Sequence, residues 1–350
     1  MAVRVVEFPT LAGYACEFSP YTTGLIAVAA SQYFGIIGNG KQLIYRIVPG
    51  SPQMQLVRQF TTQDGLYDCS WNESNSAQVV SASGDGSVKL FDLNTTDDFP
   101  VAHWHEHQTE VSGVHWNPLR KDLFLTASWD NTVKLFDPRR PKSLTTYAEH
   151  TYCVYQAIWS PRRPNVFASA SGDGTVKIWD TNTPHSIHRV APAHDAEVLT
   201  MDWNKYDENV IATGSVDRTV RIWDIRNPSI PMKVLPGHGF AVRRLKWSPH
   251  SRSILSTVSY DMTMCLWDIS NQQSPLLSRY DHHHEFVVGV DFNLFVPGEI
   301  ATTSWDGYCT VWNFQDPNIR PPKTVKRNSD RPTLPPVAPP QVLERGNMKK

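Results

Sequence analysis

The sequence has few of the features that mark secreted, membrane-spanning or cysteine-stapled proteins. Its 350 residues contain five scattered cysteines without a Cys-x-x-Cys pair, namely Cys16, Cys69, Cys153, Cys265 and Cys309. This odd number fits free thiols in a reducing compartment and argues against a disulfide or zinc framework. No apolar run approaches the roughly 20 residues that span a bilayer, so we expect no direct membrane insertion. The opening MAVRVVEFPTLAG also lacks the apolar core expected of a secretory signal.

Charge is scarce and nearly balanced, but it is unevenly distributed. Residues 318–350 hold eight of the 33 Lys and Arg and two of the 34 Asp and Glu, a net charge of +6, which leaves −7 for residues 1–317. An acidic body lacks the positive footprint of a nucleic-acid-binding protein, so we expect no nucleic-acid partner. The basic tail is proline-rich and poor in aromatics, which predicts disorder. It would act as a docking arm or as a solvated extension.

A repeated pattern dominates the chain: Ser-x-Asp, alternating apolar residues, then an aromatic residue and Asp. The copies are SGDGSVKLFD (83–92), SWDNTVKLFD (128–137), SGDGTVKIWD (171–180), SVDRTVRIWD (215–224), SYDMTMCLWD (259–268) and SWDGYCTVWN (304–313), with a degenerate copy at GNGKQLIYR (38–46). Five of the pivotal aspartates follow a histidine by 23 residues, and nine residues after each histidine stands a large aromatic. These histidines are His107, His150, His194, His238 and His283.

Each unit contains short segments with period-two alternation, joined by tight turns, which predicts antiparallel strands. A unit this small cannot bury both sheet faces, so the units must stack around an axis. Repeats of about 40–45 residues that end in Trp-Asp are typical of β-propellers. The pattern resembles the WD-repeat family and predicts an all-β, seven-bladed propeller over residues 1–316, with a disordered tail at 317–350. A strand near residues 3–8 should complete the last blade beside residues 308–314, which closes the ring.

The WD-repeat resemblance implies that a His, a strand Ser, the turn Asp and the Trp are hydrogen-bonded within each blade. The complete sets are His150/Ser171/Asp173/Trp179, His194/Ser215/Asp217/Trp223, His238/Ser259/Asp261/Trp267 and His283/Ser304/Asp306/Trp312. These sets resemble a catalytic triad only by composition, because they recur from blade to blade. We therefore predict no catalytic residues, no cofactor and no metal site. The histidines at 103–107 and 282–284 are interpreted as polar loops, since no cysteine or carboxylate framework accompanies them.

The loops at one rim of such a ring form its mouth, where we expect ligands to bind. The predicted binding residues mix carboxylates with aromatics: Asp64, Asp68, Glu110, Trp129, Glu197, Tyr260, Glu285, Phe286 and Trp305. Exposed aromatics anchor interfaces, and carboxylates between them favour a cationic ligand with an apolar side. The alternative is an ordinary solvated rim.

Segments outside the repeat indicate which group of WD-repeat proteins the chain resembles. GYACEFSPY (13–21), ASQYFGIIGNG (30–40), DGLYDCSW (64–71), HDAEVLTMDWNKYDENVIATGSVD (194–217) and GFAVRRLKWSPHSRSILSTVSYD (239–261) together resemble the peroxin-7 family, the receptors for the type-2 peroxisomal targeting signal. The resemblance implies a non-enzymatic import receptor for cargo with an N-terminal Arg-Leu-x5-His-Leu helix. It also implies a co-receptor, docking peroxins on the peroxisomal membrane, and shuttling between the cytosol and the peroxisome matrix.

A second interpretation starts from two strand ends. Trp223-Asp224-Ile225-Arg226 and Phe136-Asp137-Pro138-Arg139 match the WDxR-like boxes with which some WD-repeat proteins dock on a cullin-RING ligase. These boxes would make the chain a substrate adaptor of such a ubiquitin ligase. The alternative is an arginine that simply follows the Trp-Asp of the repeat.

Overall fold

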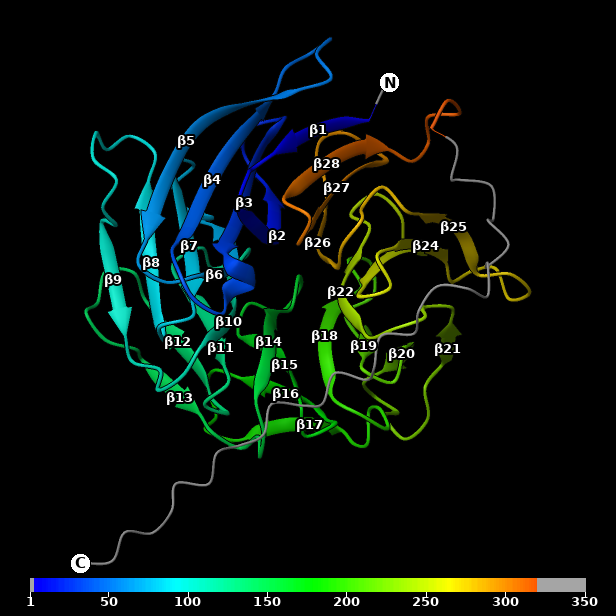
Figure 1. Cartoon of the computed structure of the whole chain (residues 1–350). Coiled ribbons are helices and arrows are strands. Elements are labelled where there is room, and N and C mark those ends of the chain that lie inside the picture. The colour runs from blue at the N-terminus through cyan, green and yellow to red at the C-terminus, as the bar shows by residue number, and fades with distance from the viewer. Residues whose placement is uncertain (1–2, 320–350) are drawn as a thin grey trace, which may run out of the picture.

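The computed structural model describes residues 3–319, and these residues form a ring of seven four-stranded antiparallel sheets (Figure 1). In six sheets the first strand in the chain lies innermost, and in the sheet that closes the ring the innermost strand is the second in chain order. Each innermost strand packs against the innermost strands of the two neighbouring sheets. The predicted seven-bladed propeller is therefore confirmed. Within the described range, no helix is long and apolar enough to cross a membrane.

The first four blades follow one another along the chain. Blade 1 contains β2 (Leu11–Phe18), β3 (Leu25–Gln32), β4 (Gly40–Ile47) and β5 (Met54–Thr62), with the short 3-10 helix η1 (Tyr33–Gly35) between β3 and β4. Blade 2 contains β6 (Leu66–Trp71), β7 (Gln78–Ser83), β8 (Ser87–Asp92) and β9 (Ala102–His105). Blade 3 contains β10 (Val111–Trp116), β11 (Phe124–Ser128), β12 (Val133–Phe136) and β13 (Thr145–Tyr147). Blade 4 contains β14 (Val154–Trp159), β15 (Val166–Ser171), β16 (Val176–Asp180) and β17 (Ser186–Val190).

The remaining three blades complete the circle. Blade 5 contains β18 (Val198–Trp203), β19 (Val210–Ser215), β20 (Thr219–Asp224) and β21 (Lys233–Pro236). Blade 6 contains β22 (Val242–Trp247), β23 (Ile254–Ser259), β24 (Met264–Asp268) and β25 (Leu276–Tyr280). Blade 7 contains β26 (Val287–Phe292), β27 (Glu299–Ser304) and β28 (Tyr308–Asn313), and takes its fourth strand, β1 (Arg4–Glu7), from the start of the chain.

The seam between the two ends of the ring is closed as predicted. β1 pairs antiparallel with β28, from Arg4 opposite Val311 to Glu7 opposite Tyr308. Just after β1, the buried Phe8 donates its backbone N–H to the Gly307 carbonyl at 2.9 Å. The ends thus cover an edge that would otherwise expose unpaired backbone groups. The predicted tail lies, from residue 320 on, outside the described residues.

The hydrophobic core lies between neighbouring blades. One cluster, for example, joins Ile158 and Val176 of blade 4 to Trp203 and Trp223 of blade 5. Ten of the 12 tryptophans are buried: Trp71, Trp104, Trp116, Trp159, Trp179, Trp203, Trp223, Trp247, Trp267 and Trp312. Each sheet therefore depends on its neighbours to bury its faces, as expected for a unit too small to fold alone.

Buried polar side chains also link the inner strands. Each inner strand ends in an aromatic residue, and the residue before it often accepts the backbone N–H of the equivalent aromatic in the next blade. Glu17 accepts from Trp71 at 2.9 Å, Asp202 accepts from Trp247 at 2.8 Å, and Asp291 accepts from Phe18 at 2.8 Å. The accepted bonds satisfy backbone donors that the sheet pairing leaves free.

Candidate functional site

The histidine network lies inside the blades rather than on a surface. In blade 4, His150 Nδ1 lies 2.8 Å from Asp173 Oδ2, and His150 Nε2 lies 2.7 Å from Ser169 Oγ. The same hydroxyl accepts the Trp179 indole N–H at 2.8 Å. Blades 5 and 6 repeat this arrangement with Thr213 and Thr257, and in blade 7 His283 bonds to Thr302 and Asp306. Because every partner is internal, the network holds the blade together.

The serines predicted for this network occupy a different place. Ser171 accepts the Asp173 backbone N–H at 3.1 Å and donates to the Tyr152 carbonyl at 3.0 Å, so it orders the turn and does not touch His150. Side chains alternate along a strand, and the residue two positions earlier lies on the same face but deeper in the blade. Ser169 is therefore the partner of His150. The same shift of two residues applies to the predicted Ser215, Ser259 and Ser304, which accept from the turn aspartates.

The inner strands have β-bulges near their N-terminal ends, and these bulges form the mouth of the ring. A bulge falls between Gly13 and Ala15, Leu66 and Asp68, and Val154 and Gln156. The residues skipped by these bulges are Tyr14, Tyr67 and Tyr155, and their contacts are with rim residues. A bulge can re-aim a side chain out of the sheet register, and here it brings three tyrosines to the mouth.

One side of the mouth is an aromatic sector, which we define as Tyr14, Phe34, Tyr260, Phe286 and Trp305. The ring centroids of Tyr260 and Phe286 are 4.9 Å apart, and Phe286 lies 5.3 Å from Trp305. Trp305 in turn lies 5.6 Å from both Tyr14 and Phe34. These side chains come from blades 1, 6 and 7, so the structure brings together the predicted Tyr260, Phe286 and Trp305. Such a cluster provides rigid apolar contact area for a ligand.

The other side is an acidic sector, which we define as Asp64, Glu110, Trp129, Tyr155 and Glu197. Tyr155 donates its hydroxyl to Glu197 Oε2 at 2.6 Å, and its ring meets Trp129 edge-on at 6.4 Å. Trp129 is 39% exposed, and all three carboxylate residues are half-buried.

The carboxylates of this sector act on a neighbouring tyrosine. Burial, followed by the negative charges of Glu110 and Asp64, raises the pKa of Tyr67 to about 12. Carboxylates that oppose a negative charge on Tyr67 attract a positive charge in the same place. The acidic sector is therefore suited to positive groups of a ligand.

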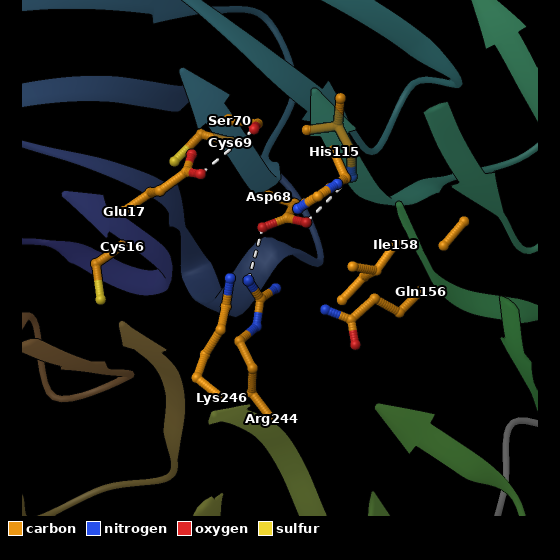
Figure 2. Close-up of a pocket in the computed structure, with 12 residues that line it drawn as sticks. Cys16, Glu17, Asp68, Cys69, Ser70, His115, Gln156, Ile158, Arg244 and Lys246 are labelled. Atoms are coloured by element: carbon orange, nitrogen blue, oxygen red, sulfur yellow. Dashed lines mark hydrogen bonds and ion pairs between the residues drawn. The ribbon is translucent and has the colours of Figure 1, made fainter. Parts of the chain in front are cut away.

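One of the predicted rim residues, Asp68, lies elsewhere. Asp68 is 4% exposed inside the ring, where it accepts from Arg244 at 2.7 Å and from the Val114 backbone N–H at 3.1 Å (Figure 2). The bulge in β6 explains the error, because it puts Tyr67 at the mouth and turns Asp68 back into the interior. Glu285 is exposed in the loop before β26, directly before Phe286 of the aromatic sector, so its place at the rim stays a prediction.

Asp68 and Arg244 line a small polar cavity at the centre of the ring, together with Glu17, His115 and Lys246 (Figure 2). Burial, and then the charge of Asp291, raises the pKa of Glu17, although Lys246 opposes this effect. Burial and the nearby lysines hold the pKa of His115 well below its ordinary value. Arg244 pairs with Asp68 at 2.7 Å and Lys246 lies 3.8 Å from Asp291, so these ion pairs link inner strands of different blades.

Sequence reasoning missed the tyrosines of the mouth. Tyr155 stands five residues after His150, and Tyr67 stands five residues after Thr62, which takes the histidine position of its repeat. The repeated offset was therefore visible, but period-two alternation assigns these side chains to the sheet faces. Only the bulges, which the alternation does not reveal, bring them to the mouth.

The two WDxR-like boxes end in exposed arginines that are bound to their own aspartates. Arg226 Nη2 lies 2.6 Å from Asp224 Oδ2, and Arg139 Nε lies 2.8 Å from Asp137 Oδ1. This local pairing accounts for each arginine within its own repeat, without an external partner.

The comparisons with known proteins agree with this architecture. The family model described as "WD domain, G-beta repeat" matches residues 54–92, 99–137, 141–180, 186–224 and 229–268, which is more than half of the chain. The chain therefore belongs to the WD-repeat family.

Relatives within this family have a specific name. The chain is 49% identical over 132 residues to a peroxisomal targeting signal 2 receptor of Dictyostelium discoideum, in a match that covers 37% of this chain and 41% of the relative. It is 44% identical over 158 residues to the receptor so named in Homo sapiens, with 45% and 48% covered. For the Saccharomyces cerevisiae receptor the identity is 43% over 134 residues, with 38% and 35% covered. In these matches the chain spans less than half of each relative's own length.

Proposed function

We propose that this chain is a non-enzymatic import receptor that binds the type-2 peroxisomal targeting signal of cargo proteins. The names of its relatives point to a peroxisomal targeting receptor, and the propeller is a scaffold that offers a binding mouth. The observation that carries the proposal is the division of this mouth into an aromatic sector and an acidic sector.

The signal has a chemistry that fits such a divided mouth. In a helix of the form Arg-Leu-x5-His-Leu, the leucines share an apolar stripe and the basic residues flank it. The stripe would pack on Tyr260, Phe286 and Trp305, while the cationic groups would face Glu110 and Glu197. So short a helix is unstable in water, and the peptide therefore folds as it binds. The cost of ordering the peptide lowers the net affinity.

We expect the receptor to need further partners besides its cargo. A co-receptor that covers the outer face of the bound helix would recover affinity by burying more of its surface. The complex would then reach docking peroxins on the peroxisomal membrane. The receptor would shuttle between the cytosol and the peroxisome matrix.

The test is to measure binding of a reporter bearing the signal to Glu110→Lys, Glu197→Lys and the double variant. Each reversal should weaken binding roughly tenfold, which corresponds to about 1.4 kcal/mol, because it replaces an attraction by a repulsion. Glu7→Lys is the matched control, since Glu7 is exposed on the outer strand β1. If the double variant binds as tightly as the wild type, the acidic sector does not hold the signal.

A further inference from the structure

The connection between β3 and β4 presents an unusual amount of apolar surface to water. We define residues 33–38 as the mouth loop. Its exposed fractions are 65% for Tyr33, 50% for Phe34, 81% for Ile36 and 67% for Ile37. Scattered exposed apolar residues are ordinary, but four within six positions form a contiguous patch, and such patches mark binding surfaces.

The mouth loop is held in a strained conformation. Tyr33, Phe34 and Gly35 have φ values of 44°, 56° and 71°, in the left-handed region that side chains disfavour. Two hydroxyls hold it there: Tyr14 donates to the Phe34 carbonyl at 2.5 Å, and Tyr67 donates to the Gly35 carbonyl at 2.8 Å. Strained residues persist where the surroundings fix them, typically at ligand clamps.

Packing at Gly35 shows how closely the mouth loop fits its support. A Cβ atom added at Gly35 would lie 2.8 Å from both Tyr14 Oη and Tyr67 Cε1. Both tyrosines are the bulge residues of the mouth. The loop and the mouth are thus built as one unit.

The mouth loop also continues the aromatic sector. The Phe34 ring lies 5.6 Å from Trp305. In Figure 1, η1 is the short blue coil at the end of blade 1 nearest the centre of the ring, close to β6. Residues 31–40 contain no charged side chain, so the mouth loop favours an apolar surface, whereas the acidic sector favours cations.

We infer that the mouth loop clamps the apolar stripe of the bound signal helix, with Ile36 and Ile37 as its contact residues. This inference rests on the proposed function. The occupant follows from the continuity of the patch with the site and from the charge pattern. A helix with its basic residues in the acidic sector turns its apolar stripe toward the aromatic sector and the loop. An apolar stripe at least about 100° wide touches both the floor of the mouth and this wall.

A titration of a fluorescent signal nonapeptide tests the clamp. The variant Ile36→Ser/Ile37→Ser removes the apolar contacts and should weaken binding at least tenfold. The control Ile230→Ser/Met232→Ser changes two side chains of similar exposure, 72% and 62%, in the connection between β20 and β21 of blade 5, and should bind like the wild type. Gly35→Ala keeps both isoleucines but displaces the loop, so it should also weaken binding. Thermal melting verifies that each variant is folded.

A double-mutant cycle locates the contact. Peptides with each leucine replaced by alanine are titrated against the wild type and the isoleucine variant. If Ile36 and Ile37 touch a leucine, the double change should cost clearly less than the product of the two single fold-changes.

The outcomes separate the two proposals. If the wild type binds the peptide and the isoleucine variant binds it equally well, the clamp is overturned and the receptor proposal still stands. Equal loss in the blade 5 control, or purely multiplicative effects in the cycle, also overturns the clamp. If the isoleucine variant still binds the peptide but no longer binds a second protein, the clamp is overturned and the loop is assigned to that protein. A wild type that does not bind the peptide overturns both proposals.

Discussion

At the residue scale, equivalent histidines in adjacent blades differ in how easily they gain a proton. Burial lowers the pKa of His194 further than Asp217 raises it, and Arg221 lowers it as well. Burial also opposes protonation of His238, but its bonds to Asp261 and Cys265 raise the pKa to about 9. In blade 6 the position of Arg221 is taken by Cys265. In blade 5 the charge of Asp217 is shared with Arg221 at 3.4 Å, whereas in blade 6 His238 supplies the positive charge itself.

This difference predicts the effect of Arg221→Cys. The substitution removes a nearby positive charge, so the pKa of His194 should rise toward that of His238. NMR titration of the imidazole resonances between pH 4 and pH 10 measures both residues in one sample. Arg189→Cys, an exposed change in β17, should leave both values in place. An unchanged His194 titration in Arg221→Cys would show that Arg221 does not contribute to its pKa.

The same network sets a pH window for blade 6. Asp261 has its pKa lowered to about 2, because hydrogen bonds and charge from His238 outweigh its burial. Its contribution to stability is complete above the ordinary carboxyl value and is lost as the pH falls toward 2. The contribution of His238 is complete below about 6.5 and is lost as the pH rises through about 9. The pair therefore stabilises blade 6 most strongly between the ordinary carboxyl value and about pH 6.5.

At the element scale, the sequence predicts strands, blades and ring closure because they follow from a repeat of fixed spacing. It cannot predict the bulges, since a skipped residue depends on how the inner strands meet around the axis. Alternation alone therefore assigns Asp68 to the rim and does not place Tyr67 there. The serine assignments failed for a related reason: the Ser-x-Asp motif is most visible at the turn, whereas the hydroxyl bonded to histidine lies two residues earlier.

Strand β1 is the element on which closure depends. Deletion of residues 1–10 removes the Arg4–Glu299 ion pair at 3.0 Å, the backbone pairing with β28 and the buried Phe8. Loss of a core phenylalanine alone costs about 3–5 kcal/mol, and the exposed edge of β28 favours aggregation. We expect a clearly lower melting temperature and light scattering on heating. Thr61→Ala, an exposed change on β5, is the control, and unchanged melting after the deletion would show that β1 is dispensable.

At the scale of the whole molecule, charge separates the ring from the tail. Residues 1–317 have a net charge of −7, and the mouth that faces the proposed cationic signal contains Asp64, Glu110 and Glu197. A field of one sign steers an oppositely charged ligand and mainly raises its association rate. Salt weakens this effect, because the Debye length is about 10 Å at 0.1 M and about 3 Å at 1 M.

Association of the signal peptide should therefore slow down as salt rises, while its dissociation changes less. Stopped-flow fluorescence between about 50 and 500 mM salt separates the two rates. In Glu110→Lys/Glu197→Lys the local field at the mouth is reversed, so the dependence of association on salt should flatten. Glu7→Lys changes the net charge by the same amount per residue but lies on the outer strand, and it should keep most of the slope. If the wild type and the double variant share one salt dependence, steering comes from the whole acidic body and the mouth acts through contact alone.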